Sequence, residues 1–305
     1  MDVIYFEKVC MCVGIALCLL GIIGNSISVY VLSKMNSRSL RLLKYLNSVD
    51  IAFLAMYCTL LTLNVVQMGS PQVSFHHVYM FLVPLVDIVL TFEAYLTVLI
   101  AFVRCLAVAM PFRFSSCMRD SVQNKMLFVI IVLSVLFNVP SVVADILYIR
   151  GMPPQNIVVS SKYVEQILCR FFPIIIIVSC NVILVVSRCR MKSLQGHDNQ
   201  CGSPHRRHPR SAFQLTCLVL AITTMFIVTH GALGATFIYY WMSNSVIEIA
   251  AYVLISARLM TVINSATNFI FYCLIGSEFR TTLASLCKKT PCSTGIKTAI
   301  PVSSV

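Results

Sequence analysis

Ionisable side chains interrupt several long apolar stretches of this 305-residue sequence. Asp50, Glu93, Arg104 and Arg258 each lie within such a stretch. A charged group at membrane depth is costly, so such a residue usually pairs with another group and marks a functional site. Their chemistry depends on how the apolar stretches bring them together. Four further residues of this kind are Asp87, Glu165, Arg170 and His230.

Two carboxylates, Asp50 and Glu93, fall at the same depth as several amide and hydroxyl side chains. Hard cations prefer oxygen ligands, and two neighbouring carboxylates can instead share one proton, because both cannot ionise cheaply. We therefore expect Na⁺ as the one candidate metal, held by Asp50 and Glu93, and no other cofactor. A hydrogen-bonded network that only packs the helices is the alternative. The polar network comprises Asn25, Asp50, Glu93, Asn264, Ser265 and Asn268.

A second group of charged residues is expected nearer one end of the stretches. Asp87 lies seventeen positions before Arg104, which is roughly 25 Å along a helix that rises about 1.5 Å per residue. Asp87, Glu165, Arg170 and Arg258 can therefore converge on an outward-open pocket of mixed charge. A purely structural interpretation is that Asp87 or Glu165 simply neutralises Arg170 or Arg258. This interpretation is compatible with a ligand pocket.

The composition shows what surrounds these residues. Apolar residues make up 58% of the chain and charged residues 11%, against about 45–50% and about 25% in soluble domains. This excludes a disordered chain, a coiled coil and a nucleic-acid binder with solvated basic faces, and it favours lipid as the surroundings. The 14 cysteines lie mostly inside apolar runs, where cysteine behaves as a small buried hydrophobe rather than as part of a disulfide framework.

Seven apolar stretches are long enough to cross a bilayer. They show no alternation of apolar and polar residues, so we expect helices rather than a β-barrel. The predicted fold is an all-α membrane protein, a seven-transmembrane helix bundle with a short amphipathic eighth helix. The predicted parts are a short extracellular N-terminus (1–8), the membrane domain (9–274), and the amphipathic helix with a cytoplasmic tail (275–305). The stretches cover about 9–33, 42–67, 77–108, 125–149, 164–190, 211–240 and 246–274.

Lysine and arginine predict the orientation of these stretches. The connections after the first, third and fifth stretches and the C-terminal tail are basic, whereas the opposite side carries only Lys8, Arg150 and Lys162. Because cytoplasmic connections carry the excess of Lys and Arg, we expect an extracellular N-terminus in a multi-pass plasma-membrane protein. The net charge of +12 is then a topology signal and an attraction to anionic lipid rather than a sign of nucleic-acid binding.

A short amphipathic segment follows the seventh stretch. Gly276 is expected to break the helix, and Phe279, Leu283 and Leu286 then recur at helical spacing. Such a segment lies along the membrane surface. Beside the lysines that follow, palmitoylation is expected, with unmodified thiols as the alternative; the candidate sites are Cys287 and Cys292.

Motifs in several of the stretches resemble those of the rhodopsin-like (class A) G-protein-coupled receptors. The resemblance covers residues 14–287, and the Asn-Phe-x-x-Tyr ending of the seventh stretch is most similar to invertebrate neuropeptide receptors of the FMRFamide type. The matching positions are Gly24-Asn25, Leu46 to Asp50, Arg104 with Pro111, Pro173, Asn268 to Tyr272, and Gly276 to Arg280.

The resemblance implies a receptor that binds an extracellular ligand, a neuropeptide, and activates a heterotrimeric G protein. It places the ligand pocket at Asp87, Glu165, Arg170, His230 and Arg258, and the coupling switch at Arg104, Phe226 and Tyr272. In the two-state scheme of the family, the sixth span moves outward and Arg104 meets the G protein.

Three departures from the family pattern affect these expectations. Val103 stands where an acid usually restrains Arg104, so we expect raised ligand-independent signalling. Ala232 stands where the sixth span usually has a proline. The connection from Arg150 to Lys162 has no cysteine, so the loop disulfide of the family cannot form in its usual place.

A transporter or channel whose intramembrane charges line a permeation path is the alternative function. Inverted repeats should mark such a protein, and the two halves of the sequence show no convincing similarity. An enzyme is not expected, because the sequence has no metal-ligand cluster and no G-x-S-x-G nucleophile motif.

Overall fold

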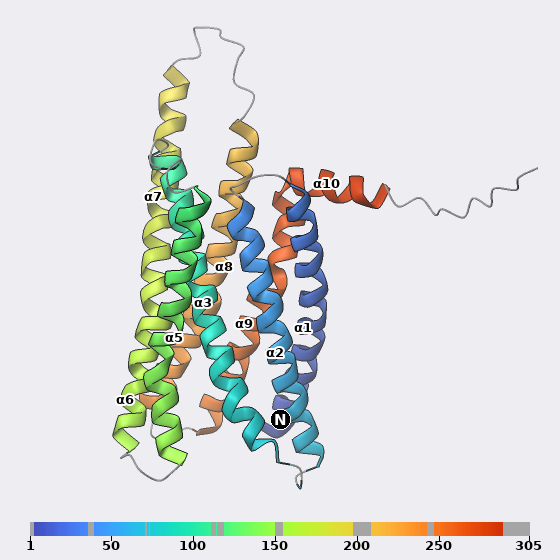
Figure 1. Cartoon of the computed structure of the whole chain (residues 1–305), viewed down its shortest axis with the longest axis vertical. Coiled ribbons are helices and arrows are strands. Elements are labelled where there is room, and N and C mark those ends of the chain that lie inside the picture. The colour runs from blue at the N-terminus through green and yellow to red at the C-terminus, as the bar shows by residue number, and fades with distance from the viewer. Residues whose placement is uncertain are drawn as a thin grey trace, which may run out of the picture.

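The computed structural model describes residues 3–35, 40–70, 72, 74–110, 114, 119–149, 155–197, 209–242 and 247–288. In this part of the chain every regular element is a helix. The long helices run side by side in one bundle, with α10 lying across one end (Figure 1). The helices are α1 (Val3–Lys34), α2 (Arg41–Gly69), α3 (His76–Ala109), α5 (Asp120–Ile149), α6 (Gln155–Gln166), the π-helix η2 (Ile167–Phe171), α7 (Phe172–His197), α8 (Pro209–Met242), α9 (Ile247–Ile275) and α10 (Ser277–Lys288).

Seven helical segments are long and apolar enough to cross a membrane, with mean hydropathies from 1.2 to 2.6. The prediction of a seven-helix bundle is therefore confirmed. Some helices begin earlier than the predicted stretches: α1 begins at Val3 and α8 at Pro209. The difference arises because polar residues in the outer turns of a helix do not end it. The fifth span is made of α6, η2 and α7, whose apolar part runs from Ser160 to Arg190.

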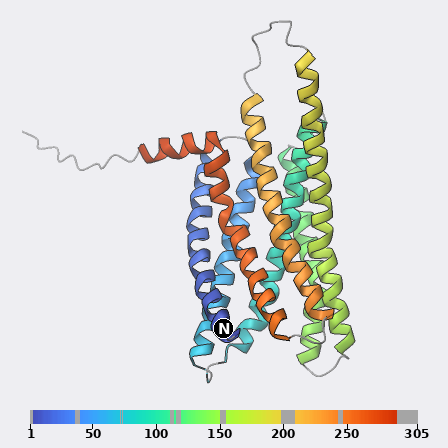
Figure 2. The same cartoon turned by 180° about the vertical axis from the view of Figure 1, so that it is seen from behind.

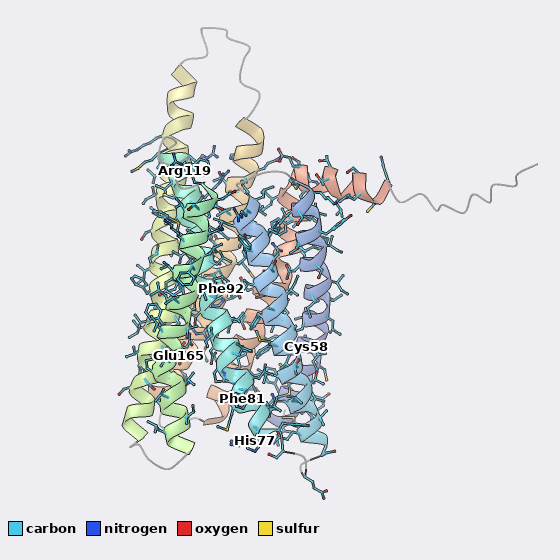
Figure 3. All side chains as sticks on the ribbon, in the orientation of Figure 1. Cys58, His77, Phe81, Phe92, Arg119 and Glu165 are labelled. Carbon is cyan, nitrogen blue, oxygen red and sulfur yellow. The ribbon has the colours of Figure 1, made fainter. Side chains whose placement is uncertain are left out.

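Large apolar side chains cover the outside of the bundle. Leu20, Phe128 and Leu274 are each about two-thirds exposed, and Phe81 is 81% exposed. Many side chains project from the outer faces of the helices in Figure 3, and the labelled Phe81 lies near the end that carries the N-terminus. A soluble protein would not leave so many of these side chains in water, so this surface is suited to lipid.

Small residues let α1 approach α9 closely. A Cβ atom on Gly21 would lie 2.8 Å from Cβ and 2.9 Å from Cα of Ala266, and one on Gly24 would lie 3.0 Å from Cβ of Phe269. Lipid is as apolar as the side chains, so helices in a membrane associate by close packing and interhelical hydrogen bonds rather than by the hydrophobic effect. The two glycines thus hold α1 against the part of α9 that carries the polar network.

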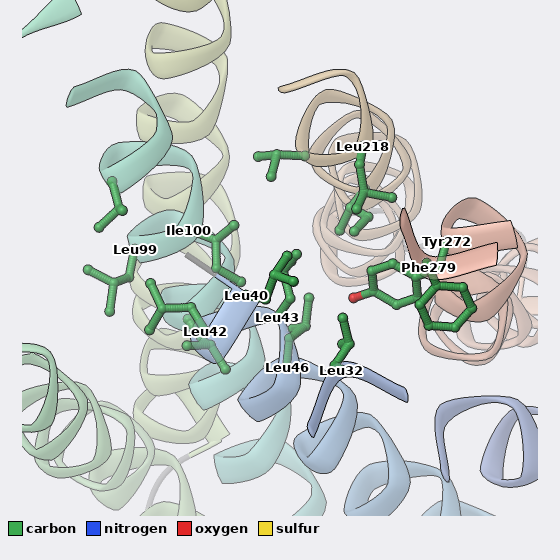
Figure 4. Close-up of a cluster of buried hydrophobic side chains, with 14 of the residues drawn as sticks. Leu32, Leu40, Leu42, Leu43, Leu46, Leu99, Ile100, Leu218, Tyr272 and Phe279 are labelled. Carbon is green, nitrogen blue, oxygen red and sulfur yellow. The ribbon is translucent and has the colours of Figure 1, made fainter. Parts of the chain in front are cut away.

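A cluster of buried side chains joins seven helices near α10. Leu43 and Leu46 of α2 meet Leu218 of α8, and Tyr272 of α9 stacks on Phe279 of α10 with ring centroids 5.3 Å apart (Figure 4). Ile100 brings α3 into the same cluster, as the close-up shows. Phe279 is 3% exposed, so α10 is anchored to the bundle by its first turn.

The eighth helix predicted from the sequence is present as α10, and Gly276 separates it from α9. It extends sideways from the bundle in both views (Figures 1 and 2), the orientation of a helix that lies along a membrane surface. The end of the bundle beside this helix is called the α10 end below, and the opposite end the N-terminal end. Cys287 is exposed at the end of α10, and Cys292 lies outside the described residues.

Candidate functional site

The centre of the bundle holds a connected group of polar side chains. Asn264 of α9 donates to Glu93 of α3 over 2.9 Å, and Ser265 Oγ lies 3.4 Å from both oxygens of the same carboxylate. Asn268 donates to Asp50 Oδ2 of α2 over 2.7 Å. Both carboxyl groups are fully buried. The structure therefore brings together the two carboxylates and the three α9 side chains expected from the sequence.

Two asparagines extend this network to other helices. Asn25 of α1 donates to the backbone oxygen of Ser265 over 2.7 Å, across the contact that Gly21 and Gly24 allow. Asn47 of α2 donates to the hydroxyl of Tyr272 over 2.7 Å. Four helices are thus tied to one polar layer, in which a change at one member affects the others.

The oxygens of this layer suit a hard monovalent cation. Asp50 Oδ1, Asn25 Oδ1 and Asn47 Oδ1 are buried and accept no hydrogen bond within the described residues. Such oxygens are the ligands that hard cations prefer. Across the residues that the structure covers, no three His, Cys, Asp or Glu side chains gather as ligands for a metal ion. Na⁺ binding by Asp50 and Glu93 stays a prediction.

A pocket of about 240 Å³ opens between α3, α5 and α6 in the N-terminal half of the bundle. Asp87 of α3 and Glu165 of α6 both line it, together with Asn138 and Ser141 of α5. Figure 3 labels Glu165 in this half of the molecule. Ser141 Oγ is buried and has no hydrogen-bond partner in the described parts of the chain. The pocket therefore presents two carboxylates and an available hydroxyl to one small volume.

Neighbouring cations limit how negative this pocket is. Lys162 Nζ lies 3.5 Å from Glu165 Oε2, one helical turn away. The charges of Glu165, Lys162 and Arg170 all act on Asp87. Arg170 also acts on Glu93 in the polar layer, so its single charge is shared between carboxylates at two levels.

The π-helical turn η2 positions Arg170. A π turn contains one residue more than an α turn and often occurs at functional sites. It directly precedes Phe172 and Pro173, and the proline has no N–H to give to the preceding turn. Arg170 and Cys169 within η2 are both buried, so the turn brings a guanidinium into the bundle between Asp87 and Glu93.

His230 and Phe226 form a stacked pair on α8. Their ring centroids are 4.0 Å apart and their planes are 18° from parallel. His230 is 1% exposed, and neither ring nitrogen has a hydrogen-bond partner among the described residues. Phe226 packs in a cluster that includes Ala101 and Cys105 of α3. The pair thus connects the middle of α8 with α3, and Phe226 contacts α3 nearer the α10 end than the charged pocket does.

Arg258 lies outside the pocket that Asp87 and Glu165 line, although its charge acts on Asp87. It is exposed and lines a different pocket, of about 270 Å³, between α1, α2, α3 and α9. Tyr79 and Val83 of α3 contact both pockets, so α3 forms the wall between them. The five residues predicted to form one ligand pocket are therefore divided between two pockets and the buried positions of Arg170 and His230.

At the α10 end, α8 is tied to both of its neighbours. Arg188 of α7 donates to Thr216 of α8 over 2.7 Å. Ser277 of α10 donates to Gln214 of α8. Arg104, at the foot of α3, is 8% exposed beside the buried Val103, and Arg188 acts on it as a neighbouring positive charge. These contacts restrain the end of α8 without an acid at position 103.

Sequence reasoning missed Ser141, Asn138, Gln214 and Ser277. Neutral polar residues carry no strong depth or charge signal, and Ser and Thr in membrane helices commonly bond to their own backbone, as Ser134 does to the oxygen of Ile130. For Ser277 the sequence did offer a signal, its position in the first turn after Gly276. A polar residue in the first turn of a helix can contact the end of a neighbouring helix.

Residues 149–290 match the family model described as the serpentine type 7TM GPCR chemoreceptor Srw. The matched segment is a little under half of the chain and contains Glu165, Arg170, His230 and Arg258. No curated protein matches the chain in sequence. The match, together with seven apolar helices, supports a G-protein-coupled receptor and a multi-pass membrane protein. It supports neither the rhodopsin-like subclass nor the likeness to FMRFamide receptors.

Proposed function

We propose that the chain is a plasma-membrane receptor that binds an extracellular peptide at the N-terminal end of its bundle and activates a heterotrimeric G protein at the α10 end. The observation that carries the proposal is that one helix, α3, contributes both a pocket carboxylate and the arginine expected at the G-protein contact. Asp87 of α3 lines a pocket in the N-terminal half, and Arg104 lies near the other end of the same helix.

The pocket suits a cationic group of the ligand. Asp87 and Glu165 line it with the available hydroxyl of Ser141. Charge-assisted hydrogen bonds to carboxylates are among the strongest in proteins. A volume of about 240 Å³ is below the usual roughly 300–1,000 Å³ of a pocket that holds a whole drug-sized ligand. We therefore expect it to receive one arginine or lysine side chain, or an N-terminal amine, of a longer peptide.

Binding of the cation would compete with Lys162 for Glu165. Lys162 pairs with Glu165 in this structure, and an incoming guanidinium would take over part of that interaction. A ligand shifts a two-state receptor only by its difference in affinity for the two states. A ligand cation held by both Glu165 and Asp87 would supply such a difference, because it would link α6 to α3, whereas the Lys162–Glu165 pair lies within α6.

The test is a screen of a peptide library on cells that carry the receptor and several chimeric G proteins, followed by matched peptides with arginine or its neutral isostere citrulline. Asp87→Asn should weaken the response to the arginine peptide by about 10- to 100-fold, the value of one lost charge-assisted contact, and should leave the citrulline peptide nearly unchanged. Lys162→Gln should strengthen the response to the arginine peptide, because it removes the cation that competes for Glu165.

The control variant is Glu7→Gln, which lies in the other pocket and should leave both peptides unchanged. Equal losses for the two peptides in Asp87→Asn would reject the direct contact. Surface expression of each variant is measured in parallel, so that a folding defect is separated from a binding defect.

A further inference from the structure

The pocket between α1, α2, α3 and α9 has charge of both signs on its walls. Glu7 of α1 and Arg258 of α9 line it. Within the described residues, neither side chain makes a hydrogen bond or an ion pair with another residue. Glu7 is half-buried and Arg258 exposed, so both groups are available to a molecule inside the pocket.

The remaining walls are rigid and largely apolar. Tyr79 donates to Asn64 Oδ1 over 3.0 Å, and Asn64 donates to the backbone of its own helix at Leu60. Tyr57 stacks on Phe53 with ring centroids 5.5 Å apart. Hydrogen bonds and stacking fix these side chains, so the polar part of the wall is formed before any ligand binds.

Apolar side chains surround the floor of the pocket. Met11 and Leu60 are 7% exposed, and Leu61 and Leu259 lie beside them. Gly14 lets Leu61 pack closely against α1, since a Cβ atom at this position would lie 2.8 Å from Leu61 Cδ1. Pockets for small molecules commonly combine an apolar lining with a few placed polar groups.

We propose that this pocket binds a small zwitterion with an apolar side chain, an amino acid or a dipeptide, whose carboxylate contacts Arg258 and whose ammonium group contacts Glu7. The two charges of the pocket lie on neighbouring helices, α1 and α9, and do not pair with each other. A zwitterion can form an ion pair with Glu7 and with Arg258 at the same time. A simple amine or a simple acid can pair with only one of the two residues.

This pocket is separate from the peptide pocket proposed above, although the charge of Arg258 acts on Asp87. The two pockets share only the α3 wall of Tyr79 and Val83. Binding here can be measured without a G protein, so a failed receptor assay and a failed binding assay are distinguishable.

The experiment uses the full chain, purified in lipid nanodiscs, with tritiated L-leucine and tritiated leucyl-leucine as probes. Unlabelled leucine should displace its own probe, and the blocked analogues N-acetyl-leucine and leucinamide should compete about 10- to 100-fold more weakly, because each lacks one charge-assisted contact. The blocked pair keeps the side chain, so partitioning into lipid does not explain a difference.

Two variants assign the charges to the walls. In Arg258→Gln, leucinamide should compete as well as leucine, since the carboxylate has lost its contact. In Glu7→Gln, N-acetyl-leucine should compete as well as leucine. Ser285→Ala is the control, because its hydroxyl bonds only to the backbone of its own helix, α10, and it should change nothing. A thermal unfolding transition like that of the unaltered chain is required of each variant.

Cys10 provides a readout in the unaltered protein. It lines this pocket and is half-buried, so bound leucine should slow its alkylation by N-ethylmaleimide, measured by peptide mass spectrometry. Cys189, exposed on α7, should react at the same rate with and without leucine. Absence of displaceable binding at millimolar leucine and leucyl-leucine, unchanged alkylation of Cys10, or the same analogue pattern in all variants would each overturn the proposal.

Discussion

Release of the two side-chain ties on α8 should raise the ligand-independent activity of the receptor. Thr216→Val removes the acceptor of the Arg188 bond with little change in shape, and Ser277→Ala removes the donor of the Gln214 bond. Outward movement of α8 at the α10 end would break both bonds, because their partners lie on α7 and α10. The variants therefore destabilise the closed state and leave the open state unchanged.

The magnitude follows from the surroundings of the bonds. Both lie in partly buried places near the end of the bundle, where a hydrogen bond contributes about 1 kcal/mol. Loss of both changes the closed–open difference by about 2 kcal/mol, or about 30-fold. If the open state is populated to roughly 1%, the double variant should raise it to about 23%.

The assay is GTP turnover by a panel of reconstituted heterotrimeric G proteins without ligand. Thr236→Val and Ser285→Ala are the matched controls, because their hydroxyls bond only to carbonyls of their own helices, and they should leave basal turnover unchanged. A double variant whose basal turnover equals that of the controls would refute the reasoning about α8.

Three further changes test other parts of the account. Val103→Asp supplies an acid beside Arg104 and should lower basal turnover; an unchanged rate would show that the missing acid has no effect. Glu93→Ser removes one carboxylate of the polar layer and should change the Na⁺ dependence of agonist affinity relative to the unaltered chain, measured as a salt titration against a choline control; identical curves would exclude a cation there. Gly21→Ala places a methyl group 2.9 Å from Ala266 Cα and should destabilise the bundle by about 1–3 kcal/mol, seen as a lower melting temperature in nanodiscs. Gly69→Ala has nothing within 4 Å and should not lower it.

The depth of each polar residue could be predicted from the sequence. A helix has a fixed rise per residue, so positions along the apolar stretches already placed Asp50, Glu93 and Asn268 in one layer. These predictions need only the height of a residue along the membrane normal, which follows from its position in the helix. Gly276 was predicted as the break before α10 on a different ground, since glycine disfavours a helix.

The direction of each side chain around its helix could not be predicted in the same way. Asp87 and Arg258 lie at similar depth but line pockets on opposite sides of α3. The π turn at Ile167–Phe171 shifts the register of the fifth span, so the face on which Arg170 lies does not follow from regular helical spacing. Contacts between helices determine both features, and a single sequence does not specify them.

In the proposed receptor, the bundle crosses the membrane an odd number of times, with its N-terminal end outside and its α10 end facing the G protein. Epitope tags placed before Met1 and after Val305 test this topology on intact and permeabilised cells. Antibody should reach the first tag on intact cells and the second only after permeabilisation. Detection of both tags on the same face of the membrane would contradict this topology.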